Sequence, residues 1–183
     1  FITLAKAQPN KIHYASSGNG SAQHLIGGLF ASMTGTQLKH VPYRSSNLAA
    51  TDLVAGVVES SFAGVPNALA QVPNGRLNAL AVTSAKRIAQ LPNVPTMEEQ
   101  GLKDLELQSY TVYAVPTGTP VAAQRRLNAA ILKAANHPDV MDKVKVAGGV
   151  YFDMNLEETQ AWQKRIQSRW NNIVQETGIK LDK

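Results

Sequence analysis

The sequence predicts an α/β fold in which a mostly parallel sheet is flanked by helices. Residues 11–83 alternate short β-prone runs with helix signals. Such an alternating order builds parallel sheets, because each helix carries the chain back across the sheet to start the next strand. The chain has 183 residues, of which 44% are hydrophobic, so it can bury a sizeable core.

The first β-prone run, residues 12–15, leads into a polar loop that contains glycine. We expect a helix from Ala22, because apolar residues then recur on one helical face, and Gly35 ends it in a C-cap position. Residues 40–43 are expected to form the second strand. Pro42 belongs at an end or edge of that strand, because proline has no backbone donor.

The next elements repeat this order. We expect a short helix over residues 48–54, a third strand over 57–63, another short helix over 67–72 and a fourth strand over 77–82. In parallel sheets of this kind, ligands bind outside the carboxyl ends of the strands. The loops that follow the strands are therefore the first place to look for a site.

The second half of the chain is less regular. A turn-rich connector over residues 91–96 precedes a short expected helix over 97–100, and residues 107–115 have strand character. Pro120 is expected at the first position of a helix, where its missing N–H costs nothing. A further helical segment is expected to begin at Pro138.

The last helix has the clearest signature. Asn155 and Glu158 have the spacing of a capping box. Trp162 and Trp170 lie on one helical stripe with Ile166, which favours core packing of the tryptophans over stacking on a ligand.

Composition excludes several classes of function. There is no cysteine, which excludes thiol catalysis, cysteine zinc sites and disulfides. The net charge of +5 is scattered and forms no basic stripe with interleaved aromatics, so we expect no nucleic-acid partner. No apolar run approaches the roughly 20 residues of a membrane span. The four histidines lack ligand spacing, and we expect no metal and no cofactor.

The loop before the first long helix, residues 16–21, is the most informative stretch. The first N–H groups of a helix have no partner within it, and the helix dipole adds roughly half a positive charge there. A carboxylate or phosphate at that point gains hydrogen bonds without a charged side chain. The loop lacks the Walker lysine and the third glycine of the dinucleotide fingerprint, which favours an anion smaller than a nucleotide. A plain serine-capped helix start is the alternative interpretation.

A hydrolase is a second interpretation of the same residues, with Ser17 or Ser21 as nucleophile, His24 as base and Asp52 as its partner. The Gly-x-Ser-x-Gly nucleophile elbow is absent. His24 is better explained as a packed or hydrogen-bonding residue. We therefore predict no catalytic residue and no enzymatic activity.

Several stretches follow one another in order along essentially the whole chain. They are Ser-Ser-Gly-Asn-Gly-Ser-Ala-Gln-His-Leu at 16–25, Met-Thr-Gly-Thr at 33–36, His-Val-Pro-Tyr-Arg at 40–44, and the segments 80–87, 91–101, 114–120 and 127–128. Together these stretches resemble the Bug or TctC-type receptors of tripartite tricarboxylate transporters.

The resemblance implies a type II periplasmic binding protein fold, in which two domains close on a ligand. We expect residues 1–10 to end a helix of domain 1 and residues 11–105 to form the ligand-binding domain 2. Residues 106–183 would supply a crossover strand and C-terminal helices that pack on domain 1. The resemblance also implies that the N-terminal part of domain 1 is missing from this sequence, and that the C-terminal helices belong to that truncated domain.

The resemblance further implies a function. The chain would be a periplasmic receptor that binds a small organic acid, such as a di- or tricarboxylate, and delivers it to membrane transporter subunits. A sensory or interaction module with the same fold is the alternative, and the truncated chain is expected to self-associate. Many relatives carry an acidic residue after the phenylalanine of the third strand, whereas this chain has Ala63 and Gly64. The implied ligand-binding residues are Ser16, Ser17, Gly18, Asn19, Gly20, Ser21, Ala22, His24, Tyr43 and Gly64.

Overall fold

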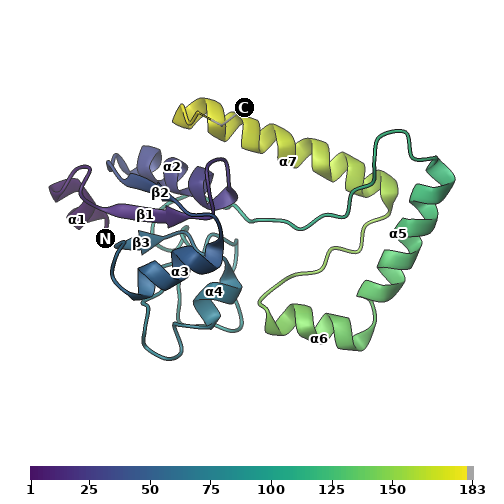
Figure 1. The fold of residues 1–183 in the computed structure, drawn as a ribbon, viewed down its shortest axis with the longest axis horizontal. Coiled ribbons are helices and arrows are strands. Elements are labelled where there is room, and N and C mark those ends of the chain that lie inside the picture. Colours follow the sequence, from purple (N-terminus) through teal and green to yellow (C-terminus); the bar gives the residue numbers. More distant parts are fainter. Residues whose placement is uncertain (181–183) are drawn as a thin grey trace. The chain divides into compact units, whose positions relative to one another are not determined.

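A computed structural model describes residues 1–180, which divide into two compact units (Figure 1). Unit 1 comprises residues 1–109 together with the described chain from residue 172 onward, and unit 2 comprises residues 110–171. No helix within residues 1–180 is long and apolar enough to cross a membrane.

Unit 1 is built on a parallel sheet of three strands, β1 (His13–Ser16), β2 (Lys39–Pro42) and β3 (Ser60–Ser61). Their order is β2-β1-β3, so β1 is paired on both sides. The hydroxyls of Ser60 and Ser61 also donate to β1 carbonyls, at 2.8 and 3.0 Å. These side-chain hydrogen bonds add to the backbone pairing of the short β3. The expected parallel sheet is confirmed.

The prediction of a fourth strand over residues 77–82 is wrong. Within the described chain, residues 77–82 join no sheet, and Val82 forms only an isolated bridge to Thr96. The reason is pairing: Val82 exchanges its backbone hydrogen bonds with the connector, accepting from Met97 and donating to Pro95. β3 is also shorter than expected, because residues 56–57 still close the turn that ends the preceding helix.

Two helices cover opposite faces of the sheet (Figure 1). Side chains alternate along a strand, so neighbouring residues of β1 point to opposite faces. Tyr14 lies against α2 (Ala22–Thr34), whereas Ala15 packs with Ala49 of α3 (Ser46–Val54). Both helices match the sequence prediction, and Gly35 ends α2 in the left-handed conformation, with φ of 63°.

The core on the α2 side is a run of aromatic rings. Tyr14 meets Phe62 edge-on at 5.8 Å between centroids, Phe62 lies 5.5 Å from Phe30, and Phe30 lies 5.9 Å from Phe1. Phe1 precedes α1 (Ile2–Ala7), the expected helical start of the chain. These rings tie the first residues of the chain to the sheet.

Two short expected helices of unit 1 differ in the structure. The helix expected over residues 67–72 is α4 (Val65–Leu69), which begins earlier because Pro66 fits the first turn. Residues 97–100 form a turn and not a helix. The side chain of Glu99 bonds back to the N–H of Thr96, which closes the turn without a helical ladder.

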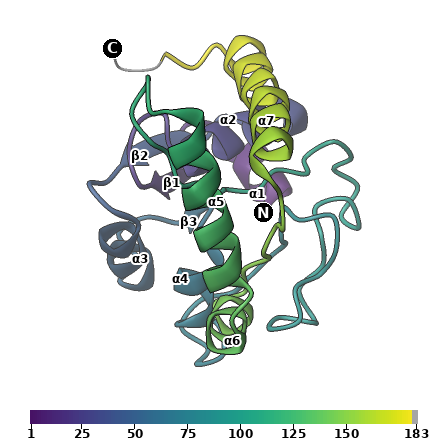
Figure 2. The ribbon, with the colours of Figure 1, turned by 90° about the vertical axis from the view of Figure 1, so that its right-hand side faces the viewer.

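Unit 2 consists of α5 (Val121–Ala135), α6 (Pro138–Val146) and the first part of α7 (Leu156–Thr177), which continues into unit 1. Figure 2 shows the turn from α5 into α6. The three helices confirm the prediction, although Pro120 is the residue before α5 and not its first residue. The strand character expected over residues 107–115 yields no strand in the described chain.

The signature of the last helix is confirmed. Glu158 Oε2 accepts from the Asn155 N–H at 2.8 Å, and Asn155 Oδ1 accepts from the Glu158 N–H at 2.9 Å. Trp162 packs edge-on against Tyr110, with 4.7 Å between ring centroids, and tilted against Phe152. Trp162 is therefore a packing residue of unit 2.

Gly27 of α2 provides the first prediction. A Cβ at this position would clash with the ring of Tyr14. Gly27→Ala should lower the free energy of unfolding by about 1–3 kcal/mol through overpacking, less the gain of up to about 1 kcal/mol in helix propensity. Gly28→Ala is the matched control, because the close contact of its Cβ is with the flexible end of Ile179, and Thr177 lies at an ordinary van der Waals distance. Urea unfolding should rank Gly27→Ala as the less stable variant, and the opposite ranking would contradict this packing.

Candidate functional site

The carboxyl ends of the three parallel strands lie at one edge of the sheet, and each is followed by the start of a helix. The connection after β1 leads to β2 on one side, and the connection after β2 returns past β1 to β3 on the other. In a sheet of this order the crevice for ligands opens between β1 and β3. The loop after β1, residues 17–21, borders that crevice, and so do residues 62–64 after β3.

The first half of the loop is fixed by neighbouring side chains. The Ser17 N–H donates to Gln23 Oε1 at 2.6 Å, and the Gly18 N–H donates to Ser16 Oγ at 3.1 Å. Gly18 has a φ of 127°, and a Cβ there would lie 3.5 Å from the carbonyl oxygen of Tyr43. The positive φ favours glycine at this position, whereas the distance to the end of β2 is an ordinary van der Waals contact.

The second half of the loop is closed onto the helix start. The Gly20 N–H donates to His24 Nδ1 at 3.1 Å, and the Ser21 N–H donates to the Gly18 carbonyl at 3.2 Å. Ser21 is the N-cap of α2, and its hydroxyl oxygen accepts from the His24 N–H at 3.3 Å. Most loop amides that could have faced a ligand are thus used inside the protein.

The donors that remain belong to the first turn of α2. Within residues 1–180, the N–H groups of Ala22 and Gln23 have no acceptor. The hydroxyls of Ser17 and Ser21 also donate to no described residue. The positive end of the helix dipole lies at the same point. This arrangement can hold a small anion through neutral donors.

Two histidines lie directly beneath this loop. The rings of His24 and His40 stack with 3.8 Å between centroids and 6° between planes. Ser16 Oγ lies 2.6 Å from His40 Nε2, and Ser16 is fully buried. Burial, followed by the charge of His24, lowers the pKa of His40 from its ordinary 6.5 to about 4. His40 is therefore neutral at neutral pH.

Tyr43 is fixed at the end of β2. Its N–H donates to the Ser16 carbonyl at 3.0 Å, and its hydroxyl donates to Asp52 Oδ2 at 2.8 Å. Burial and the Asp52 carboxylate raise the pKa of Tyr43 above its ordinary value. Tyr43 is thus adjacent to the loop, with its hydroxyl directed to α3.

The ligand-binding residues predicted from the sequence differ in their exposure to solvent and in their place in the fold. Asn19 and Gly20 are exposed at the tip of the loop, whereas the Ser16 side chain is buried beneath it. Gly64 follows the neighbouring strand and is the residue before α4. Its carbonyl accepts from Asn67 at 3.0 Å, so its part is to begin that helix.

The structure does not assemble the hydrolase constellation. Asp52 bonds to Tyr43, and the Ser21 hydroxyl bonds to the backbone of His24 and not to its ring. Ser16 does contact an imidazole, that of His40, but no substrate can reach a side chain that is fully buried. No group of three or more potential ligand side chains within residues 1–180 could hold a metal ion.

Sequence reasoning missed Gln23 and His40. Gln23 braces the loop through Ser17, and His40 braces it through Ser16. The available signals were a polar side chain in the first turn of a helix and a histidine inside an expected strand. Neither signal identifies its partner, because the partner of His40 is 24 residues away.

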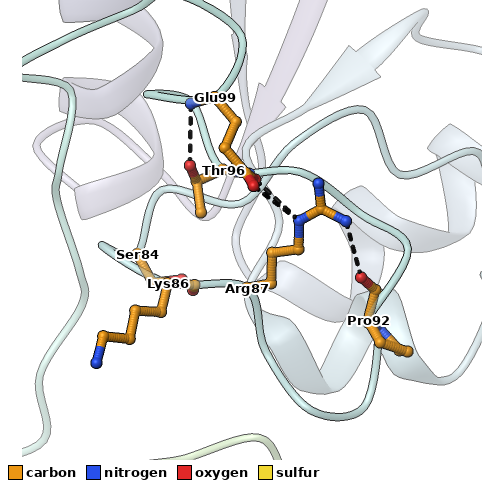
Figure 3. Close-up of polar contacts among 6 residues, drawn as sticks. All are labelled: Ser84, Lys86, Arg87, Pro92, Thr96 and Glu99. Atoms are coloured by element: carbon orange, nitrogen blue, oxygen red, sulfur yellow. Dashed lines mark hydrogen bonds and ion pairs between the residues drawn. The ribbon is translucent and has the colours of Figure 1, made fainter.

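A hollow lies in the connector after the sheet, and Figure 3 shows the polar contacts of the residues around it. It has a volume of about 470 Å³ and is lined by Ala85, Lys86, Arg87, Thr96, Glu98 and Glu99. Arg87 Nε donates to both Glu99 oxygens, at 2.9 and 3.1 Å, and Arg87 Nη1 donates to the Pro92 carbonyl at 3.1 Å. The ion pair holds the pKa of Glu99 below its ordinary value. The guanidinium and the carboxylate satisfy each other, so this hollow is a braced turn, and the loop after β1 is the better candidate site.

The pKa of His40 gives a prediction for stability. Its imidazole binds a proton near pH 6.5 in the unfolded chain but only near pH 4 in the folded protein. The unfolded state is therefore favoured as the pH falls from about 6.5 toward 4, and the contribution of neutral His40 is complete above that window. His40→Gln, which does not titrate, should show a smaller fall in melting temperature between pH 7 and pH 4.5 than the unchanged chain. His137→Gln on the exposed start of α6 is the control, and equal slopes for all three proteins would contradict the prediction.

Comparison with protein families gives one match over residues 1–179, to the receptor of the tripartite tricarboxylate transporter family. A protein from the tcbD–tcbE intergenic region of Pseudomonas sp. strain P51 is 40% identical over 174 residues, which are 90% of this chain and 52% of that protein. Protein BugT of Bordetella pertussis is 31% identical over 180 residues, 98% of this chain and 55% of BugT. The chain thus spans about half the length of the curated relatives it matches.

Comparison with solved structures also finds proteins of similar fold. Rpa4515 of R. palustris, solved with adipate, has a TM-score of 0.90 and 29% identity over 97% of this chain and 60% of its own. The periplasmic binding protein BugD has a TM-score of 0.83 and 28% identity over 98% of this chain and 60% of its own. The expected periplasmic binding protein fold is confirmed.

Proposed function

The chain belongs to the receptor family of tripartite tricarboxylate transporters, and from this premise we propose that it binds the carboxylate of a small organic acid at the loop between β1 and α2. The resemblance noted in the sequence is thus confirmed. The family is one of receptors, which agrees with the expectation that the chain is not an enzyme. The binding site and its ligand are the subject of the proposal.

The observation that carries the proposal is that the N–H groups of Ala22 and Gln23, at the start of a 13-residue helix, have no partner in the described part of the chain. They lie at the carboxyl edge of the sheet, beside the crevice expected between β1 and β3. Residues 16–25 contain no lysine or arginine. A carboxylate bound there would be held by N–H groups, serine hydroxyls and the helix dipole.

The proposed ligand class is a small dicarboxylate of the kind represented by adipate. Rpa4515, a neighbour at 29% identity, was solved with adipate. Residues 17–21 are short and internally bonded, so one carboxylate can approach the first turn of α2 without displacing the loop. This class remains a proposal, since the chain covers 60% of that structure.

We propose the domain organisation expected from the sequence as well: residues 1–10 from domain 1, 11–105 as the ligand-binding domain, and 106–183 packing on domain 1. Two observations support the second and third of these ranges. The sheet and its covering helices all fall within residues 11–105. In addition, α5 and α6 bury none of their side chains within the described chain, and Val121 and Val146 are exposed. The exposed apolar side chains of these amphipathic helices are suited to a further packing surface.

Periplasmic location and delivery of the ligand to membrane transporter subunits complete the proposal. The family description names the transporter, and BugD is described as a periplasmic binding protein. This chain covers 60% of BugD, so location and delivery require a test on the protein itself. Fractionation of cells that produce it should place the receptor in the periplasm.

Ala22 offers a direct test of carboxylate binding. Ala22→Pro removes one N–H at the first helical position, where proline is tolerated, and Ser21 already has the extended conformation (ψ of 156°) that proline requires before it. Loss of one hydrogen bond to a charged group, about 1.5–3 kcal/mol, should weaken adipate binding roughly 10- to 100-fold. Titration of ¹⁵N-labelled protein with adipate, followed by NMR, measures even weak affinities.

The matched control for this experiment is Ser46→Pro, the first position of α3, which also follows an extended residue, Ser45. It should leave adipate binding unchanged. Equal binding by Ala22→Pro and the unchanged chain would place the carboxylate elsewhere. Citrate and acetate in parallel titrations then rank a tricarboxylate and a monocarboxylate against the dicarboxylate.

Self-association is the second testable part of the proposal. Exposed apolar side chains on α5 and α6, Val121, Leu127, Val140 and Val146 among them, favour contact with another surface. Light scattering over a concentration series should show a mass that rises above 19.7 kDa. Leu127→Gln with Val146→Gln should lower that tendency, whereas a constant monomer mass at high concentration would contradict it.

A further inference from the structure

The loop after β1 is held by two histidines through separate contacts. On one side the Gly20 N–H donates to His24 Nδ1 at 3.1 Å. A backbone N–H can only donate, so Nδ1 of His24 must be unprotonated in this arrangement. His24 is 8% exposed, and therefore its ring is largely shielded from water while it supports the loop.

The second contact passes through Ser16. His40 Nε2 lies 2.6 Å from Ser16 Oγ, and the same oxygen accepts the Gly18 N–H at 3.1 Å. The two imidazoles stack at 3.8 Å, so each fixes the plane of the other. Alternate residues of the loop, Gly18 and Gly20, thus depend on one pair of rings.

We propose that the neutral imidazoles of His24 and His40 are positioning residues, which fix residues 17–21 in the shape that leaves the first-turn N–H groups of α2 open to a carboxylate, and that protonation of the pair releases the loop and the ligand. This inference rests on the proposed function of the loop. It makes carboxylate binding dependent on pH through groups that do not touch the ligand.

The chemistry of the contacts gives the direction. A proton on His24 Nδ1 would oppose the Gly20 N–H, donor against donor. Two imidazolium rings stacked at 3.8 Å would also repel each other. Protonation therefore favours an open loop, and the ligand should bind more weakly in acid.

The groups that face the pair support the same direction. From β1, the Tyr14 ring lies 5.0 Å from the His40 ring, and its hydroxyl donates to the His24 carbonyl at 3.3 Å. Burial raises the pKa of Tyr14 to about 12, so this phenol stays uncharged across the relevant range. The titratable groups that α2 and β2 contribute to this contact are the two imidazoles, His24 from α2 and His40 from β2. Burial and the charge of His24 lower the pKa of His40 to about 4, which keeps this ring neutral near pH 7.

Two substitutions of His24 separate positioning from packing. His24→Asn keeps an acceptor for the Gly20 N–H but does not titrate in this range. His24→Phe keeps a ring for the stack and removes the acceptor. His137→Asn on α6 is the control. NMR of the ¹⁵N-labelled chain reports the loop without any ligand, through the N–N coupling across the Gly20–His24 hydrogen bond and the exchange rate of the Gly20 amide.

Adipate titrations of the same proteins at pH 7.5 and pH 4, the pH at which His40 begins to bind a proton, report binding. At pH 7.5, His24→Phe should bind adipate about tenfold more weakly than the unchanged chain, the equivalent of one hydrogen bond. His24→Asn should bind nearly as well as the unchanged chain at pH 7.5 and should lose less affinity at pH 4. The protonation of adipate is common to all proteins, so it cancels from the comparison.

The outcomes distinguish the two proposals. If no N–N coupling is found at pH 7.5, or if Gly20 exchanges equally fast in His24→Phe and the unchanged chain, the positioning role is overturned whether or not adipate binds. If the coupling is present and disappears in acid but no protein binds adipate, the histidine pair fixes the loop and the proposed ligand fails. If His24→Asn and the unchanged chain lose affinity equally in acid, the dependence on pH lies outside the pair.

Discussion

The pairing of β1 on both of its edges is the constraint on which the site depends. A central strand with parallel neighbours brings three strand ends to one edge of the sheet, and each end is followed by a helix start. Ser16 is the last residue of β1, and its carbonyl also accepts the Tyr43 N–H beyond the end of β2. The pairing therefore continues up to the first residue of the loop, so the loop begins from a fixed point.

The side chains on the two faces of β1 make different kinds of contact. Ala15 packs against α3 with small apolar neighbours, which lets that helix approach closely. Tyr14 and Ser16 point to the α2 face, where the Tyr14 ring fits over Gly27 and the Ser16 hydroxyl contacts His40. The α2 face thus combines an aromatic core with the polar contacts that shape the loop, and packing and site geometry depend on the same strand.

The loop is stabilised by hydrogen bonds that its own backbone N–H groups donate within the protein. The N–H groups of Ser17, Gly18, Gly20 and Ser21 all bond within the protein. A loop with most of its amides satisfied keeps its shape without a ligand. Within residues 1–180, the donors that stay open at this point include the first-turn N–H groups of α2 and the hydroxyls of Ser17 and Ser21. Residues 16–24 contain no lysine or arginine. The open donors at the start of α2 explain how this stretch could still bind a carboxylate, as proposed.

Local chemistry in the sequence determined the helix ends and the order of elements. Ser21 caps α2, Gly35 ends it in the left-handed region, and Asn155 with Glu158 forms a capping box, because each signal acts over four residues or fewer or requires one conformation. The site was predicted as a stretch, residues 16–24 with Tyr43 and Gly64, and its ligand contacts remain a prediction. Only the tertiary structure decided that residues 77–82 pair with the connector and not with the sheet, that His24 stacks on His40, and which amides stay open. Those outcomes depend on partners brought together from distant parts of the chain, and no spacing along the sequence specifies which partners meet.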